Sequence, residues 1–208
     1  MKHIRFYNKG QLITESKVEN KNIINVDIQP EYEPIPFLSN WVKFINKSSK
    51  LNNIIFLYNG YDTLGMISEV EYKEWLIDCG IKKNVVYNAI FYDKGYAFFR
   101  YCMDEGIDEQ SIVDLVKYMI NHNINDSRYI DENMWNNYME ETDHTESDVR
   151  DLLEEASDMI NIPELMDFLK NYRDIVLTGG GITECLKEVE IALMALDKKY
   201  EILEEYTY

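Results

Sequence analysis

The sequence predicts an α/β fold, a three-layer αβα sandwich built on a mainly parallel sheet. Two observations predict this fold. Short apolar runs that are long enough for a buried strand recur along the 208 residues. Longer segments between them carry apolar residues at helical spacing, and such alternation is typical of a parallel sheet with helices on both faces. The expected strands cover residues 23–28, 54–58, 85–92 with a break at Asn88, 175–177 and 200–208, the last near an edge of the sheet.

The helices expected between these strands are indicated by their ends as well as by their apolar faces. Ser68 is placed to begin a helix, and Gly80 is placed to stop it. Thr183 can cap a helix that begins just after it, and Thr145 with Asp148 resembles a capping pair. The expected helices cover residues 38–45, 68–77, 108–122, 146–160 and 184–196.

The chain is expected to form a single domain over residues 1–208. Within it, residues 1–20 are predicted to be an N-terminal extension that contains an edge hairpin. Residues 100–165 are predicted to be a helical insertion over one end of the sheet, and residues 165–169 to lead into the strand at 175.

Composition excludes several classes of function. The net charge of −17 disfavours binding to nucleic acid or to anionic membranes. The first residues lack the apolar core of a signal peptide, and no run reaches the ~18–20 apolar residues that span a bilayer. Three cysteines are too few for a disulfide framework, which indicates a reducing, cytoplasmic location. The three histidines are far apart in sequence, so we expect no metal and no cofactor.

The most informative stretch is a short strand, three glycines and a helix that starts near Cys185. A helix N-terminus is electropositive, and a cysteine there has its thiolate favoured, with pKa values below the usual ~8.5. The same main-chain N–H groups can hold an oxyanion. The alternative is that Cys185 is a small buried hydrophobic residue and that Gly179, Gly180 and Gly181 only allow close packing.

Two charged residues follow other predicted strands. Asp27 lies at the end of an apolar strand, where it is either functional or a cap for the following loop. Lys94 ends the strand near residue 90, and most lysines are solvated surface residues. If the sheet is parallel, Asp27, Lys94 and Cys185 project from the same edge.

At these three places the chain resembles the isochorismatase-like cysteine hydrolases, the superfamily that includes nicotinamidases and N-carbamoylsarcosine amidases. Residues 24–32, INVDIQPEY, are similar to the first strand of the family. Asp93-Lys94-Gly95 resembles its later Lys-Gly segment, and residues 178–185, TGGGITEC, resemble the turn before its nucleophile. The ordered set is more specific than any of its short motifs.

The resemblance implies that Cys185 attacks a carbonyl carbon to form a thioester, that Asp27 transfers protons and that Lys94 stabilises both anions. It also implies an oxyanion hole made by the N–H groups of Gly181 and Cys185, with a cis peptide bond between Gly180 and Gly181. The candidate substrate-binding residues are Gln29, Tyr32, Tyr61, Tyr96 and Gly180.

The chain departs from the family in one respect that bears on substrate. Nicotinamidases bind a metal through an Asp/His cluster, but no histidine lies between His3 and His122 here. We therefore expect a metal-independent hydrolase acting on a small amide or related C–N bond, not on nicotinamide. Relatives tend to oligomerise, so a homo-oligomer is expected, and residues 100–165 are either a lid or a subunit interface.

Two alternatives to an enzyme remain open. The protein could keep the fold and pocket as a catalytically silent small-molecule binding protein. It could also be a structural or regulatory partner whose acidic helices mediate contacts. The presence of a complete Asp-Lys-Cys set argues for the enzyme.

Overall fold

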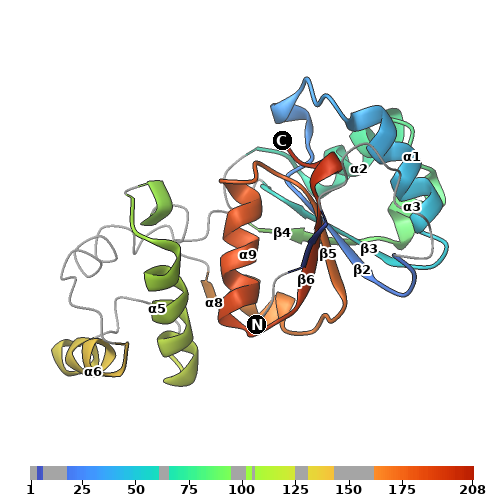
Figure 1. Ribbon diagram of the computed structural model, residues 1–208. Helices are drawn as coiled ribbons and strands as arrows, with labels where there is room; N and C mark the ends of the chain where they lie inside the picture. Colours follow the sequence, from blue (N-terminus) through green and yellow to red (C-terminus); the bar gives the residue numbers. More distant parts are fainter. Residues whose placement is uncertain are drawn as a thin grey trace. The chain divides into compact units, whose positions relative to one another are not determined.

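The computed structural model describes residues 4–6, 18–60, 66–94, 102–104, 106–124, 131–142 and 162–208. The α/β class and the parallel sheet are confirmed. Within the described residues, six strands form one sheet in the order β1-β6-β5-β2-β3-β4, and every neighbouring pair is parallel (Figure 1). The strands are β1 (Ile4–Phe6), β2 (Asn22–Val26), β3 (Asn53–Tyr58), β4 (Ile90–Asp93), β5 (Ile175–Gly179) and β6 (Tyr200–Leu203).

Helices follow β2, β3, β4 and β5 before the next strand begins, which is consistent with the predicted three-layer sandwich. The α-helices are α1 (Leu38–Ser48), α2 (Glu69–Asp78), α3 (Lys83–Asn88), α5 (Glu109–Asn121), α6 (Glu132–Thr142), α8 (Ile162–Leu169) and α9 (Cys185–Ala195). Two 3-10 helices, η2 (Pro30–Tyr32) and η5 (Glu204–Tyr206), follow β2 and β6.

The chain divides into two compact units. The first contains Met1–Gly95, Tyr172–Lys187 and Lys199–Tyr208, and therefore all six strands. The second contains Tyr96–Asn171 and Glu188–Lys198. The predicted insertion at 100–165 falls within the second unit, and helix α9 begins in the first unit and continues in the second.

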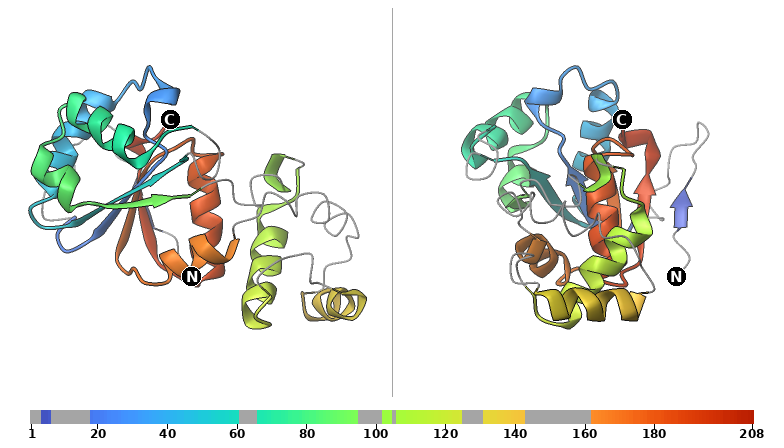
Figure 2. Two further views of the ribbon diagram at one scale, coloured as in Figure 1. Left: turned by 180° about the vertical axis from the view of Figure 1, so that it is seen from behind. Right: turned by 90° about the vertical axis from the view of Figure 1, so that its left-hand side faces the viewer.

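The core of the first unit shows why β2 and β3 are buried on both faces. In β2 and β3, alternate residues such as Ile23 and Phe56 join a cluster with Trp41 of α1 and Tyr72 of α2. These helices and α3 cover one face of the sheet (Figure 2). The intervening residues of the same strands, including Ile24, are fully buried as well. Because neither face is exposed, the strands read as continuous apolar runs and not as alternating ones.

The polar side chain of Asn25 lies inside this core, and both its oxygen and its nitrogen form hydrogen bonds. The Asn25 side chain on β2 is completely buried. Its Oδ1 accepts hydrogen bonds from Trp41 Nε1 at 2.9 Å and from Thr178 Oγ1 at 2.7 Å, and its Nδ2 donates to the Ile55 oxygen at 2.9 Å. The amide therefore links β2 to α1, β3 and β5, and neither its oxygen nor its nitrogen lacks a hydrogen bond.

The predicted ends of α2 are confirmed. Ser68 and Glu71 form a capping box, in which each side chain accepts a hydrogen bond from the main chain of the other. Gly80 stops the helix with a φ of +103°, a conformation that glycine adopts without the penalty of a Cβ atom. Helices α1 and α5 also begin and end within a few residues of the predicted positions.

Other expectations were wrong or fall outside the described residues. Residues 85–87 are predicted as the first part of a strand but lie in helix α3, because burial of Val85 and Val86 against the core outweighs their strand propensity. Residues 4–6 form an edge strand parallel to β6, so β6 lies second from the edge. The return strand of the expected hairpin, the helix at 146–160 and its capping pair lie outside the described residues.

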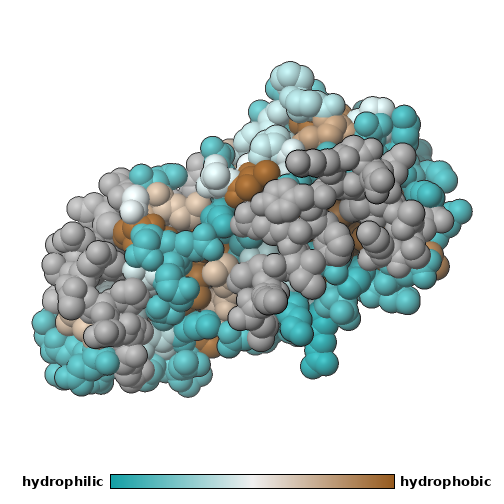
Figure 3. Space-filling view, in the orientation of Figure 1, coloured by the Kyte–Doolittle hydropathy of each residue, from teal (hydrophilic) through white to brown (hydrophobic). Residues whose placement is uncertain are grey.

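Among the coloured residues of the face shown in Figure 3, hydrophilic ones cover more of the surface than hydrophobic ones, which form separate patches. No helix in the described ranges combines the length and hydrophobicity that crossing a bilayer requires.

Candidate active site

The strand order defines where a site is expected. From β2 the chain adds β3 and β4 on one side, and it later adds β5 and β6 on the other. The carboxyl ends of β2 and β5 therefore mark the point where the strand order reverses. Open α/β sheets bind ligands at this kind of switch point. Asp27 follows β2, and the glycine turn follows β5.

Strand β3 sets the positions of Asp27 and Lys94. The Asp27 N–H donates to the Leu57 oxygen at 2.9 Å, and the Lys94 N–H donates to the Tyr58 oxygen at 2.7 Å. The two side chains meet across β3, where Lys94 Nζ lies 3.3 Å from Asp27 Oδ2. Asp27 is completely buried, and Lys94 is 2% exposed. Lys94 is therefore not the solvated surface residue that its type suggests.

The Asp27 carboxylate is buried without a hydrogen bond. Neither of its oxygens has a hydrogen-bond partner among the described residues, and the ion pair with Lys94 is its compensation. A loop-capping aspartate would accept main-chain N–H groups, so the capping interpretation is not supported. A buried charge with so few partners costs stability, in contrast to the fully paired Asn25. Such an arrangement is found where a group has a functional role.

The glycine turn brings Cys185 to the same end of the sheet. Gly179 has a φ of +79°, and a Cβ atom there would lie 2.3 Å from the Val26 oxygen. Gly180 has a φ of +59°, and its Cβ atom would lie 2.9 Å from the Leu186 nitrogen. Both positions therefore require glycine. Cys185 is the first residue of α9; it forms no disulfide, and the residue is partly exposed.

The oxyanion hole predicted from the N–H groups of Gly181 and Cys185 stays a prediction, but one part of the predicted turn geometry is wrong. The Gly181 oxygen accepts hydrogen bonds from the N–H groups of Glu184 and Leu186 at 2.9 and 3.2 Å. The Gly181 N–H itself has no acceptor within the part of the chain that the structure describes. The expected cis bond between Gly180 and Gly181 is wrong, because this bond is trans and the left-handed φ values of Gly179 and Gly180 make the turn instead.

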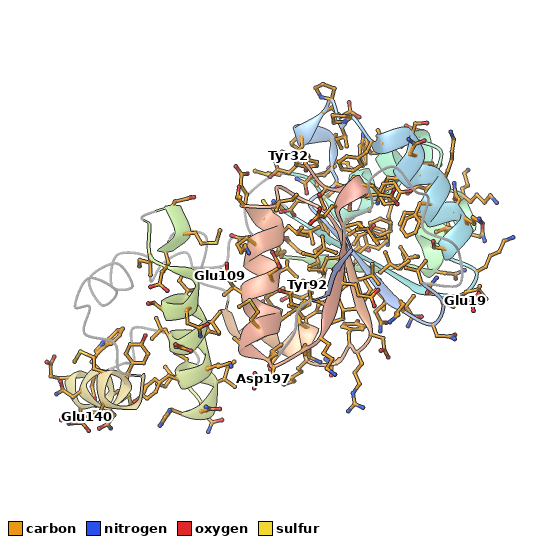
Figure 4. All side chains as sticks on the ribbon, viewed as in Figure 1. Glu19, Tyr32, Tyr92, Glu109, Glu140 and Asp197 are labelled. Atoms are coloured by element: carbon orange, nitrogen blue, oxygen red, sulfur yellow. The ribbon has the colours of Figure 1, made fainter. Side chains whose placement is uncertain are left out.

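The pKa of the Tyr32 phenol depends on the charges of Asp27, Cys185 and Lys94. Burial, followed by the negative charges of Asp27 and Cys185, raises the pKa of the Tyr32 phenol to about 12. A hydrogen bond from Asn59 and the positive charge of Lys94 act in the opposite direction. Three groups that are remote in sequence thus act on one hydroxyl, which lies in the segment after β2 (Figure 4). The pKa of Tyr208 is raised as well, first by partial burial of its phenol and then by the charges of Asp27 and Cys185, although 40% of the residue is exposed.

The remaining predicted binding residues differ in their surroundings. Gln29 is buried, and its Oε1 accepts a hydrogen bond from the Asn59 N–H at 2.9 Å, which ties the ends of β2 and β3 together. Gly180 shapes the turn, as described above. Tyr61 and Tyr96 lie outside the described residues.

Sequence reasoning missed two residues at this site. Asn59 is buried, and its Nδ2 donates to the Tyr32 hydroxyl at 3.3 Å, while its Oδ1 has no partner among the described residues. Asn59 follows a predicted strand and precedes Gly60, and this position could have identified it as a candidate site residue. Tyr208 contacts both Asp27 and the glycine turn, but nothing distinguishes it in sequence from the 15 other tyrosines.

No candidate metal centre is found in the described ranges, where no group of three His, Cys, Asp or Glu side chains is arranged to hold an ion. Comparisons of the chain with protein-family models, with curated proteins and with solved structures give no match. The resemblance to isochorismatase-like hydrolases therefore stays a prediction, and the case for function depends on the site itself.

Proposed function

We propose that the protein is an isochorismatase-like cysteine hydrolase that cleaves a small amide or a related C–N bond through a thioester. The observation that carries this proposal is the buried Asp27–Lys94 ion pair at the switch point of the sheet. The start of α9 supplies the third member, Cys185, whose charge acts on the same phenol as that pair.

In the first step, the Asp27 carboxylate takes the proton of the Cys185 thiol, and the sulfur attacks the carbonyl carbon of the amide. The carbonyl π electrons move to the oxygen and give a tetrahedral oxyanion. The N–H groups of Gly181 and Cys185 stabilise that oxyanion, helped by the dipole of α9.

In the second step, the tetrahedral intermediate collapses and its C–N bond breaks. The protonated Asp27 gives its proton to the leaving nitrogen, so that an amine or ammonia departs and a thioester remains. Water then loses a proton to Asp27 and attacks the thioester carbon. The Cys185 thiolate leaves and regains its proton, and the product is a carboxylic acid.

Lys94 has an electrostatic role in this scheme. Its ammonium group is held 3.3 Å from Asp27 in a buried setting, where opposite charges interact more strongly than in water. It favours the ionised carboxylate in the resting enzyme and stabilises the thiolate after proton transfer. No step requires a metal or a cofactor.

The proposal also includes the location of the protein, its assembly and the charge of its substrate. We propose a cytoplasmic homo-oligomer that acts on a small molecule and has no membrane or nucleic-acid partner. Anionic charges surround the phenols of Tyr32 and Tyr208, so neutral or cationic amides are favoured over anionic ones.

Ammonia release from a panel of small primary amides and ureas tests the proposal. The wild type should release ammonia from at least one member, and Cys185→Ala should abolish the release while Cys79→Ala leaves it unchanged. If ammonia release survives in Cys185→Ala, the thioester route is wrong. If no amide is turned over but one binds, the silent binding protein is the better interpretation.

A further inference from the structure

Tyr208 touches both halves of the proposed site. Its hydroxyl donates a 2.7 Å hydrogen bond to the main-chain oxygen of Asp27. Its main-chain N–H donates to the Gly180 oxygen at 3.2 Å, and its own main-chain oxygen accepts from the Ile182 N–H at 2.9 Å. One residue is thus bonded to the carboxylate-bearing segment and to both sides of Gly181.

Aromatic contacts hold the Tyr208 ring in place. The ring stacks on Phe37 with a centroid distance of 5.6 Å and an angle of 22°. The Tyr32 ring lies 6.4 Å away in a tilted arrangement. These two contacts restrict rotation of the Tyr208 side chain, so little further conformational entropy is lost when its hydroxyl bonds to Asp27.

Asp27 has a backbone conformation that needs such support. Its φ of +48° lies in the left-handed region, which residues other than glycine adopt at some cost. The bond from its N–H to Leu57 fixes the peptide group before it, and the bond from Tyr208 fixes the peptide group after it. Without the Tyr208 hydroxyl, one of the two main-chain hydrogen bonds that hold the left-handed backbone of Asp27 is lost, and the residue that carries the carboxylate is less firmly fixed.

We propose that Tyr208 is a positioning residue that aligns Asp27 with the turn carrying Cys185. This inference rests on the proposed function, since it gives Tyr208 a role only if Asp27 exchanges a proton with Cys185. Tyr208 does not react itself. It sets the relative position of the proton acceptor and the nucleophile, a quantity to which catalytic rates are sensitive at the level of about 1 Å.

The test is the pH profile of Cys185 alkylation by iodoacetamide, followed by peptide mass spectrometry. Tyr208→Phe removes only the hydroxyl, and Tyr206→Phe is the matched control, because the Tyr206 hydroxyl is bonded to Glu205 and not to Asp27. We expect the midpoint of the Cys185 profile to rise by about one pH unit in Tyr208→Phe. It should not move in Tyr206→Phe, and the Cys79 profile should be the same in all three proteins.

A double variant shows whether Tyr208 acts through Asp27. If it does, Tyr208→Phe has no further effect on the Cys185 profile once Asp27→Asn is present. Additive shifts, or an unchanged midpoint in Tyr208→Phe, would overturn the inference while leaving the proposed function intact. By contrast, a wild-type Cys185 that reacts no faster than Cys79 contradicts the proposed function itself.

A second variant covers the case in which Tyr208→Phe does not fold. Phe37→Leu removes the ring on which Tyr208 stacks but keeps the hydroxyl. It should raise the Cys185 midpoint in the same direction by a smaller amount. If Phe37→Leu folds and leaves the midpoint where it is in the wild type, the ring does not position Asp27 and the inference is wrong.

Discussion

Asp27 and Lys94 donate their main-chain N–H groups to consecutive carbonyl oxygens on the strand between them, those of Leu57 and Tyr58. Neighbouring strands lie about 4.8 Å apart, so the two main chains are separated by roughly twice that distance. The long lysine side chain spans the gap and brings its ammonium group to 3.3 Å from the carboxylate. The sheet therefore fixes the geometry of the pair before either side chain contributes.

Because Asp27 and Lys94 form a buried ion pair, we predict that substitutions of the two residues have strongly coupled effects on the free energy of unfolding. Lys94→Met leaves the Asp27 charge buried alone and should lower the free energy of unfolding by about 3–5 kcal/mol. Asp27→Asn removes the carboxylate that faces the buried Lys94 ammonium and should also lower the free energy of unfolding. In the double variant both charges are absent, so its destabilisation should be far smaller than the sum of the two. Urea unfolding of the four proteins measures the coupling, and additive losses would show that the pair does not interact.

The glycine turn predicts a difference between two alanine substitutions. Gly179→Ala forces a Cβ atom to within 2.3 Å of the Val26 oxygen, whereas Gly80→Ala meets nothing closer than Val42 Cγ1 at 3.5 Å. Both glycines have a positive φ and lie in the same unit, so each substitution costs about 1–2 kcal/mol of backbone strain. Gly179→Ala should cost about 1–3 kcal/mol more from overpacking. Equal losses in thermal or urea unfolding would contradict the close approach at Gly179.

Tyr32 should report the charges around it through its pKa. In NMR spectra of ¹³C-tyrosine-labelled protein, the phenol that Tyr32→Phe assigns to Tyr32 should titrate near 12. Tyr206→Phe assigns the Tyr206 phenol, whose pKa burial also raises to about 12. Its pKa should fall in Asp27→Asn and in Cys185→Ala, and it should rise in Lys94→Met. A pKa that is unchanged in all three variants would mean that the three groups do not converge on Tyr32.

The same shift has a consequence for stability. The folded-state pKa of Tyr32, about 12, lies above the ordinary tyrosine value of 10.0, so between these values the unfolded chain loses a proton that the folded protein keeps. The contribution of Tyr32 to stability is therefore complete below pH 10 and is lost as the pH rises towards 12. Alkaline unfolding of Tyr32→Phe should depend less steeply on pH in that window.

Much of the first unit could be predicted from sequence because its signals are local. The apolar runs of β2, β3 and β5 and the Ser68–Glu71 capping box each lie within a few residues. Helix α3 was misread because two adjacent valines favour a strand, while their burial depends on distant residues. Helix α6 is not among the predicted helices, since three asparagines, which are poor helix formers, interrupt its sequence, ENMWNNYMEET.

In the candidate site, only the residues that directly follow a predicted strand can be recognised from the sequence. Asp27, Lys94 and the glycine turn are each recognisable beside an apolar run. The roles of Asn59 and Tyr208 depend on hydrogen bonds to residues far away in sequence, such as the one between Tyr208 and Asp27. No local pattern encodes such a contact, so these residues emerge only when the fold is known.

The most direct test of the account is the rate of iodoacetamide alkylation of Cys185 at pH 7, compared with Cys79 and Cys102 in the same native protein. Burial raises the pKa of Cys79 to about 11 and that of Cys102 to about 12, so both should react slowly. We predict that Cys185 is alkylated at least about tenfold faster, and that Asp27→Asn or Lys94→Met removes most of this advantage. If Cys185 reacts no faster than Cys79, or keeps its full rate in both variants, the proposed nucleophile and its activation are contradicted.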